Sequence, residues 1–348
     1  MENKKVMIAM SGGVDSSVAA ALLCEEGYEC MGATMRLFCG SAEDLEDAKK
    51  VANHLGMPFE AFSCENEFEE NVIQRFISAY ERGDTPNPCI DCNRYMKFGN
   101  FHKKAEGLGY EYVATGHYAQ IEYDDERGRY LLKKGMDRTK DQSYVLFSLT
   151  QKQLSRTLFP LGKYTKEQIR DMAQKYGFVN AEKKDSQDIC FVPDGDYAEF
   201  IKEYTGKEYP PGSFVDEEGN VLGQHKGIIG YTIGQRRGLG LSLKESMYVI
   251  KKDMKKNEVI LGFNDDLFGD RLVARNFNWI ACEEPKPGEQ VKCTAKTRYS
   301  QKEQPATAKV TEDGCVEVIF NEPVRAITSG QSVVLYDDDI VIGGGTIM

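Results

Sequence analysis

The sequence contains no apolar run approaching the roughly 20 residues that a membrane-spanning helix needs. Its first residues, MENKKVMIAMSGG, lack the pattern of a secretory signal and lead directly into a predicted strand. Basic residues are also in deficit, because 44 Lys and Arg stand against 55 Asp and Glu and give a net charge of −11. This balance excludes a generally basic nucleic-acid binder, so any RNA-binding surface must be local. We therefore expect a cytoplasmic protein without a membrane partner.

The ten cysteines do not indicate a disulfide framework. In the cytoplasm, glutathione and thioredoxin keep thiols reduced, so the question is which cysteines take part in chemistry. Most free cysteines act as small buried hydrophobic residues. We expect that role for Cys24, Cys30, Cys64, Cys282, Cys293 and Cys315.

The length of 348 residues predicts two or three domains. In the first half, short apolar strands alternate with amphipathic helices, which is typical of a parallel sheet covered on both faces. We therefore predict a doubly wound α/β domain over residues 1–204. Its predicted strands are Val6–Met10, Cys30–Met35, Phe59–Ser63 and Tyr112–Gly116, and its helices include Ala42–Leu55 and Asn66–Arg82.

The pattern changes beyond Tyr204, where Pro210-Pro211-Gly212 marks a boundary. Short β-branched runs separated by turn residues follow, and helix signals almost vanish. We predict two small, mainly β domains over residues 205–270 and 271–348. Their predicted antiparallel strands are Met247–Ile250, Glu258–Leu261, Gln290–Thr297, Ala306–Val310, Val316–Phe320 and Ser332–Tyr336.

The strongest chemical signal is the run Ser11-Gly12-Gly13-Val14-Asp15-Ser16-Ser17 between a predicted strand and a predicted helix. Glycines let backbone N–H groups face an anion, and the helix N-terminus adds partial positive charge, so a phosphate group is expected here. The Lys of the Walker A pattern is missing, which argues against γ-phosphate transfer. The run resembles the pyrophosphate-binding loop (PP-loop) of the ATP pyrophosphatase superfamily, whose members adenylate substrates. Asp15 then becomes the candidate ligand for Mg²⁺ on the departing pyrophosphate. The alternative is an ordinary Gly-rich turn that caps a helix.

Two cysteine motifs narrow the substrate class. They are Asn87-Pro88-Cys89-Ile90-Asp91-Cys92-Asn93-Arg94 and Asp185-Ser186-Gln187-Asp188-Ile189-Cys190-Phe191. The chain also contains Ala114-Thr115-Gly116-His117-Tyr118 and Lys140-Asp141-Gln142-Ser143-Tyr144. With these motifs the chain resembles the bacterial tRNA-specific 2-thiouridylase family over essentially its whole length. The resemblance implies an adenine nucleotide alpha hydrolase-like first domain and a last domain that is a tRNA-contacting β-barrel.

The resemblance also implies a reaction, which is thiolation of the wobble uridine (position 34) of tRNA with consumption of ATP. Cys190 would carry sulfur as a persulfide received from a sulfur-relay protein or a cysteine desulfurase, and Cys92 would resolve that persulfide. The chemistry is coherent. The uracil oxygen is a poor leaving group, but after adenylation it can leave as part of AMP when a sulfur nucleophile attacks. A disulfide between Cys92 and Cys190 would end the turnover, and reduction would restore the thiols.

The position three residues before Cys92 departs from the family pattern. Members of the family often have Asp at this position, whereas this chain has Cys89. Cys89, Cys92 and Cys190 therefore raise the alternative of a [4Fe–4S] cluster with one open iron that binds sulfide. A zinc clip at Cys89 and Cys92, or a redox pair that protects Cys92, are further alternatives.

The resemblance assigns binding residues as well. ATP contacts are expected from Ala9, Met10, Ser11, Gly12, Gly13, Val14, Asp15 and Ser16, and from the backbone around Met35 and Gly116. Chemistry at the uracil carbonyl requires an unstacked base, for which a pocket is expected at Asn87, Pro88 and Cys89. Contacts to tRNA are expected from His117, Lys140, Asp141, Gln142, Arg298, Tyr299 and Gln331, and phosphate contacts from the pairs Lys183-Lys184, Arg236-Arg237 and Lys251-Lys252.

Two other functions are compatible with parts of the sequence. A small-molecule ligase of the same superfamily, resembling argininosuccinate synthase, would use the loop but have no need of Cys92 and Cys190. A non-catalytic RNA-binding or iron–sulfur sensing protein would need neither Asp15 nor the paired sulfur cysteines. The presence of all three residues favours the thiolase.

Overall fold

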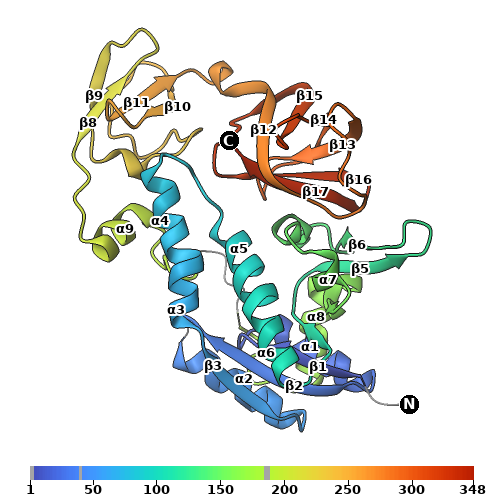
Figure 1. The fold of residues 1–348 in the computed structure, drawn as a ribbon. Helices are drawn as coiled ribbons and strands as arrows, with labels where there is room; N and C mark the ends of the chain where they lie inside the picture. Colours follow the sequence, from blue (N-terminus) through green and yellow to red (C-terminus); the bar gives the residue numbers. More distant parts are fainter. Residues whose placement is uncertain (1–3, 39–40, 184–188) are drawn as a thin grey trace.

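The computed structural model describes residues 4–38, 41–183 and 189–348. The described part contains three sheets, which form an α/β unit, a small middle domain and a C-terminal barrel (Figure 1). None of the helices in these ranges combines the length and the apolar character needed to cross a membrane.

The first sheet is parallel, with strand order β3-β2-β1-β4-β7. This order confirms the predicted doubly wound α/β fold, and it places the carboxyl ends of all five strands at one edge. The strands are β1 (Lys5–Ala9), β2 (Glu29–Arg36), β3 (Phe59–Ser63), β4 (Tyr112–Ala114) and β7 (Thr157–Leu158). Other helical elements in the first part of the chain are α1 (Val14–Glu25), α2 (Ala42–His54), η3 (Ser143–Leu146), α7 (Gln151–Leu154), η4 (Pro160–Lys163), α8 (Lys166–Lys175) and α9 (Tyr197–Thr205), of which α9 lies next to the middle sheet (Figure 1).

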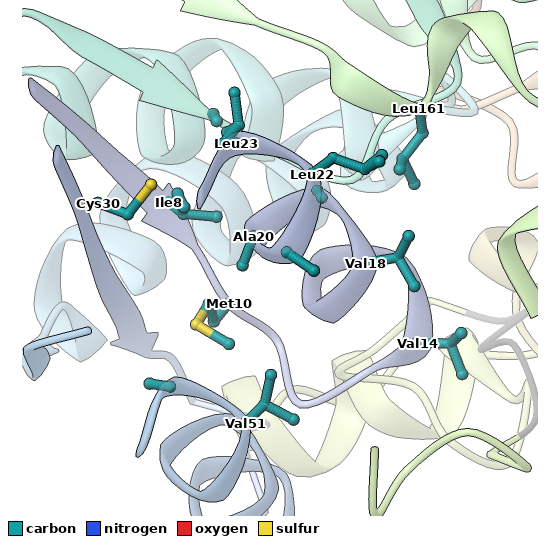
Figure 2. Packing of buried hydrophobic residues seen from close by; sticks show 14 of the residues in the cluster. Ile8, Met10, Val14, Val18, Ala20, Leu22, Leu23, Cys30, Val51 and Leu161 are labelled. Carbon is teal, nitrogen blue, oxygen red and sulfur yellow. The ribbon is translucent and has the colours of Figure 1, made fainter. Parts of the chain in front are cut away.

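Helix α1 is held rigidly because it is buried along most of its length (Figure 2). Val14 and Val18 face the same apolar cluster as Ile8 of β1 and Val51 of α2. Complete burial of such an aliphatic side chain stabilises the fold by about 1.5–3 kcal/mol. The loop that precedes α1 is therefore fixed at both ends by well-packed elements.

Two long helical segments lead away from the sheet toward the other domains (Figure 1). The first runs through α3 (Glu65–Phe68), the π-helical η1 (Glu69–Ile73) and α4 (Gln74–Glu81). The second runs through α5 (Pro88–Asp91), the π-helical η2 (Cys92–Asn100) and α6 (Phe101–Gly107). The prediction of a helix from Asn66 to Arg82 is correct, but the sequence reading did not foresee the π turns. Such turns are rare and occur frequently at functional sites.

The middle sheet has strand order β10-β11-β8-β9. Its strands are β8 (Gly212–Val215), β9 (Val221–His225), β10 (Tyr248–Asp253) and β11 (Glu258–Gly262), and η5 (Ile228–Gly230) lies between them in the chain. The predicted strands Met247–Ile250 and Glu258–Leu261 correspond to β10 and β11, which pair antiparallel as expected. The sequence analysis did not predict β8 and β9, and β8 pairs with β11 in parallel. The two strands of this pair are joined by a long connection rather than a hairpin, so the chain path does not force them to be antiparallel.

The C-terminal sheet closes into a six-stranded barrel, which confirms the predicted last domain. The order β12-β15-β14-β13-β16-β17 is completed by a pairing between β12 and β17. The strands are β12 (Phe268–Trp279), β13 (Gln290–Lys296), β14 (Gln304–Val310), β15 (Val316–Arg325), β16 (Ser332–Asp337) and β17 (Ile340–Ile347), and η6 (Asp265–Leu267) precedes them. The domain limits at residues 204 and 270 stay a prediction.

A β-hairpin from the first half of the chain extends the sheet of the barrel (Figure 1). It consists of β5 (Ala119–Asp124) and β6 (Arg129–Lys134), and Lys133 of β6 pairs with Ile340 of β17. The sequence analysis did not predict this hairpin. It matters for function because it ties the barrel to the segment that directly follows β4.

Candidate functional site

The loop after β1 has the backbone geometry that an anion site requires. Gly12 has a φ of +74°, and a Cβ atom there would lie 2.2 Å from the carbonyl oxygen of Asp44, so this position requires glycine. Gly13 is the N-cap of α1 and offers no side chain to the first N–H groups of the helix. These N–H groups and the helix dipole therefore face outward for an anionic ligand.

Side chains around the loop hold it in this shape. Ser16 and Ser17 donate their hydroxyl hydrogens to the Gly13 carbonyl, over 3.1 and 3.0 Å. Asn180 donates to the Gly12 carbonyl over 2.9 Å and to Ser17 Oγ over 3.0 Å. The sequence analysis missed Asn180, because a single Asn far along the chain carries no recognisable pattern. The loop is therefore organised before any ligand binds.

We expect Gly12→Ala to destabilise the protein by about 2–3 kcal/mol and to raise the KM for ATP about tenfold or more, because the methyl group would collide with backbone rather than with a movable side chain. Gly13→Ala is the matched control. Its new Cβ meets only Ser11 Oγ, at 3.4 Å, and its φ of −90° suits any residue. Thermal melting and ATP titration of both variants check this, and equal losses in the two would contradict the role given to Gly12.

Asp15 sits at the start of α1 and is held by two partners. Lys166 lies 2.8 and 2.9 Å from its two carboxylate oxygens, and the Tyr118 hydroxyl donates to Oδ1 over 2.7 Å. Lys166 is 8% exposed and is the first residue of α8, after the capping box of Thr165. It brings to this loop the cation that the missing Walker A lysine supplies elsewhere. The sequence analysis missed Lys166, because no spacing links it to the loop.

The predicted Mg²⁺ ligand fits this arrangement as a single carboxylate. Mg²⁺ in nucleotide sites commonly takes one or two carboxylate oxygens and completes its shell with substrate phosphates and waters. Asp15 is 31% exposed at its side chain, which leaves it accessible from the loop side. Such an ion would neutralise charge on the departing pyrophosphate.

The residues expected to hold adenosine gather at the carboxyl edge of the sheet. The Met10 carbonyl accepts from Thr34 Oγ1 over 2.6 Å, which links the ends of β1 and β2, where Ala9 and Met35 also lie. A Cβ on Gly116, just beyond β4, would lie 2.8 Å from the carbonyl carbon of Asp15. The structure therefore brings these predicted residues together with the loop.

His117 follows Gly116 and is buried. Its Nδ1 lies 2.7 Å from Thr115 Oγ1. Burial lowers the pKa of this imidazole well below its usual value, and the positive charge of Lys97 lowers it further. His117 is therefore neutral at physiological pH and acts through hydrogen bonding or packing rather than through charge.

The three candidate sulfur cysteines lie within electrostatic reach of one another. Desolvation by the surrounding protein raises the pKa of the Cys89 thiol and raises that of Cys92 to about 11, and the negative charge of an ionised Cys190 contributes to both shifts. Cys89 and Cys190 are exposed and Cys92 is half-buried. Asn87 fixes the start of α5 by accepting from the Cys89 N–H over 3.1 Å, and Pro88 occupies the first helical position. Of the second motif, residues 185–188 lie outside the described residues, as does Lys184.

No three His, Cys, Asp or Glu side chains within the described ranges are grouped closely enough to hold a metal ion. Cys89, Cys92 and Cys190 therefore do not fit a three-cysteine cluster site as they stand in this structure. A zinc clip at Cys89 and Cys92 finds no third ligand in the same ranges.

Lys97 connects the cysteines with the nucleotide edge. It lies on η2 five residues after Cys92, and five residues is the hydrogen-bonding interval of a π-helix. Its charge lowers the pKa of Cys89, Cys92 and His117, so all three lie within its field. Sequence reasoning missed Lys97, and the only signal was its place in the same helix as Cys92.

The expected tRNA segment, residues 140–142, is a rigid turn between the hairpin and the core. Asp141 accepts from the N–H groups of Gly135 and Ser143, each over 3.1 Å, and Gln142 exchanges two hydrogen bonds with the Tyr118 backbone. The Tyr299 hydroxyl donates to the Asp141 carbonyl over 3.1 Å. Burial raises the pKa of Tyr299, and the charges of Asp141 and Cys89 add to the shift, so this turn lies on the side of the cysteines.

Two other predicted tRNA residues make structural contacts between domains. Arg298 donates to the carbonyl of Ile233 over 3.0 Å and to that of Ala326 over 3.2 Å, and so joins the barrel to the middle domain. Gln331 donates to the carbonyl of Thr85 over 2.7 Å, which docks the barrel next to the first cysteine motif. Any role of these two side chains toward tRNA stays a prediction.

The basic pairs have mixed surroundings. Lys183 lies 2.7 Å from Asp44 and 2.9 Å from Asp47. Lys252 donates to the Tyr231 carbonyl, and burial lowers its pKa to about 8. Arg236, Arg237 and Lys251 are exposed. Lys183 and Lys252 are thus bound within the protein, whereas the Arg236-Arg237 pair faces solvent.

The parallel sheet, the glycine loop at its carboxyl edge and the Asp15–Lys166 ion pair together define an ATP-binding α/β domain of the PP-loop class. Comparisons with known proteins agree with this. Residues 4–194 match the tRNA methyl transferase HUP domain, residues 198–263 the tRNA methyl transferase PRC-barrel domain, and residues 269–347 the Aminomethyltransferase beta-barrel domain.

The chain is 50% identical to the tRNA-specific 2-thiouridylase MnmA of Acetivibrio thermocellus over 100% of both chains. It is 49% identical to that of Clostridioides difficile over 99% of this chain and 98% of the relative. The chain therefore belongs to the tRNA-specific 2-thiouridylase family, which confirms the resemblance seen in the sequence and the class of enzyme expected from it. Among solved structures, the NMN synthetase of Francisella tularensis matches 59% of this chain and 78% of its own at 15% identity, with a TM-score of 0.35.

Proposed function

We propose that this protein adenylates the wobble uridine of tRNA at the loop of residues 11–17 and then delivers sulfur to it from a persulfide on Cys190. The observation that supports this most is that the nucleotide loop and the cysteine thiols are linked through the same residues. The ionisation of Cys89 and Cys92 is influenced both by Cys190 and by Lys97, and Lys97 also acts on His117, next to the glycine that contacts Asp15. One bound base can therefore meet both the nucleotide and the sulfur.

In the first step, the triphosphate lies on the N–H groups of the loop and the pyrophosphate leaves as the uracil O2 attacks the α-phosphate. Lys166 places a buried ammonium beside Asp15, so positive charge is already in place where negative charge develops. The organised loop and the hydrogen bonds from Asn180 keep these groups oriented without rearrangement. The product is an adenylated uridine whose leaving group is AMP.

In the second step, the terminal sulfur of the Cys190 persulfide attacks the activated C2 carbon and AMP departs. The Cys92 thiolate then attacks Cys190 Sγ, so that a Cys92–Cys190 disulfide forms and the transferred sulfur stays on the base as 2-thiouridine. Lys97 stabilises the anionic sulfur species during both events, because its charge favours the ionised forms of Cys89 and Cys92. A cellular dithiol then reduces the disulfide, which suits a cytoplasmic location.

The substrate and the sulfur donor follow from the same site. Asn87, Pro88 and Cys89 form the start of α5 beside the barrel, where an unstacked anticodon base has access to both steps. Cys190 is exposed, which permits a persulfide-carrying relay protein or a cysteine desulfurase to reach it.

The test is nucleoside mass spectrometry on unmodified tRNA incubated with the protein, ATP, Mg²⁺ and a persulfide donor. Parallel aerobic and anoxic preparations separate the two modes of sulfur delivery. Appearance of 2-thiouridine in both supports transfer from Cys190. Product only in the anoxic, iron-containing sample would favour a cluster instead, and no product with ATP consumed on a small molecule would remove the tRNA assignment.

The raised pKa of Cys92 predicts a specific pH dependence of its reactivity. Because only the thiolate is alkylated, and the pKa lies at about 11, the rate with iodoacetamide should rise about tenfold per pH unit from pH 7 to 10 with no plateau. An ordinary thiol would level off near pH 9. Peptide mass spectrometry of the Cys92 peptide gives the rate, with a Cys89→Ser variant to separate the two neighbouring thiols. A plateau below pH 9 would contradict this environment.

A further inference from the structure

A groove of about 610 Å³ lies between the helical segment that contains α4, the loop leading into α5, and the edge of the barrel formed by β12 and β17. Four arginines line it, namely Arg75, Arg82, Arg94 and Arg275. Asn87 lines it as well, so the groove begins where the pocket for the target base is expected. A local concentration of arginine stands out in a chain whose net charge is −11.

Two of the three acidic residues that line the groove, Asp91 and Asp84 but not Glu70, orient two of these arginines. Arg75 lies 3.5 Å from Asp91, and Arg82 lies 3.4 Å from Asp84. Arg94 and Arg275 take part in no ion pair within the part of the chain that the structure describes. Arg94 instead stands over the ring of Phe147, with its guanidinium carbon 5.9 Å from the centroid. The guanidinium groups of Arg94 and Arg275 are therefore available to pair with an anionic ligand.

Irregular backbone on both walls directs side chains into the groove. On the barrel side, β12 has a bulge between Arg275 and Asn278, and Asn276 within it has a φ of +51°. A left-handed residue in a strand is uncommon, and bulges often re-aim side chains next to a site. On the helical side, the π-helical η1 includes Glu70 and ends immediately before Gln74 and Arg75. Both walls thus depart from regular structure at the same groove.

We propose that this groove binds backbone phosphates of the RNA strand that flanks the target nucleotide, an assignment that rests on the proposed function above. The planar guanidinium group matches the geometry of a phosphate and binds it through two hydrogen bonds. The lining is mostly polar, so it suits a charged backbone better than the apolar side chains of a protein partner. Because one wall belongs to the α/β domain and the other to the barrel, the RNA strand bridges the two.

The test compares Arg275→Gln with Arg271→Gln. Arg271 lies on the same strand, is exposed and is paired with Glu317 outside the groove, which makes it a matched control. Binding of an unmodified tRNA anticodon stem-loop is measured from 50 to 300 mM salt. For Arg275→Gln we expect roughly tenfold weaker binding and a log–log salt slope smaller by about one. Arg271→Gln should keep the wild-type slope.

Arg94→Gln provides a second, independent variant, with thermal melting to show that it is folded. An unchanged slope for both Arg94→Gln and Arg275→Gln would overturn the assignment, as would an equal drop for Arg271→Gln. Normal stem-loop binding by Arg275→Gln, combined with slower sulfur transfer from a persulfide protein to Cys190, would mean that the groove takes a protein partner and would also overturn it. Failure of the wild-type protein to bind any tRNA is a different result, because it removes the proposed function itself.

Discussion

Replacement of Cys190 by Ser will lower the formation of 2-thiouridine by about 10³-fold or more, because the sulfur carrier is lost, while the tRNA-dependent exchange of pyrophosphate into ATP continues near the wild-type rate. The two outcomes separate because Cys190 belongs to the cysteine group, whereas the nucleotide loop is organised by Ser16, Ser17 and Asn180. Nucleoside mass spectrometry measures the first quantity and ³²P exchange the second.

The Cys92→Ser variant tests the resolving step separately. It should still accept a persulfide on Cys190 but fail to resolve it, so the protein should carry one extra sulfur in intact-protein mass spectrometry. Cys293→Ser is a matched control, because this thiol lies in the barrel, where its Sγ donates to the Ala306 carbonyl. Loss of pyrophosphate exchange in a folded Cys190→Ser protein would contradict the division between the two steps.

The local parts of the site were predictable from sequence, because strand, glycine loop and helix N-terminus are contiguous. Gly12 was recognisable from the residues next to it in the sequence. The structure explains why this position is glycine, because a Cβ atom would collide with the Asp44 carbonyl. Lys166 and Asn180 reach the same loop from more than 150 residues away. No spacing or periodicity encodes such a contact, so these residues needed the folded structure.

The fold shows the same division between local and long-range information. The alternation of strands and helices predicts the parallel sheet, and the C-terminal β-branched runs predict the barrel strands. The β5–β6 hairpin was missed because its partner, β17, lies about 200 residues later in the chain. The parallel pairing of β8 with β11 was missed for the same reason, since strand direction across a long connection depends on the path of the chain.

The Asp15→Asn substitution should abolish adenylation, with pyrophosphate exchange lower by about 10²–10³-fold. The amide cannot pair with Lys166 as an anion, and it is a poorer ligand for Mg²⁺ than a carboxylate. The change should also destabilise the protein by about 2 kcal/mol, between the values for exposed and fully buried pairs, because Lys166 is only 10% exposed at its side chain while Asp15 is 31% exposed. Loading of Cys190 with persulfide should be unaffected.

A double variant separates stability from catalysis at this pair. Asp15→Asn combined with Lys166→Met removes the unpaired buried charge, so its melting temperature should return toward that of the wild type. Its pyrophosphate exchange should nevertheless stay at the level of Asp15→Asn or below, because both the carboxylate and the cation at the pyrophosphate are gone. Recovery of exchange together with stability would show that the pair only holds α1 and α8 together. Continued inactivity in a fully stable protein would mean that the Asp15 carboxylate and the Lys166 ammonium act directly on the nucleotide.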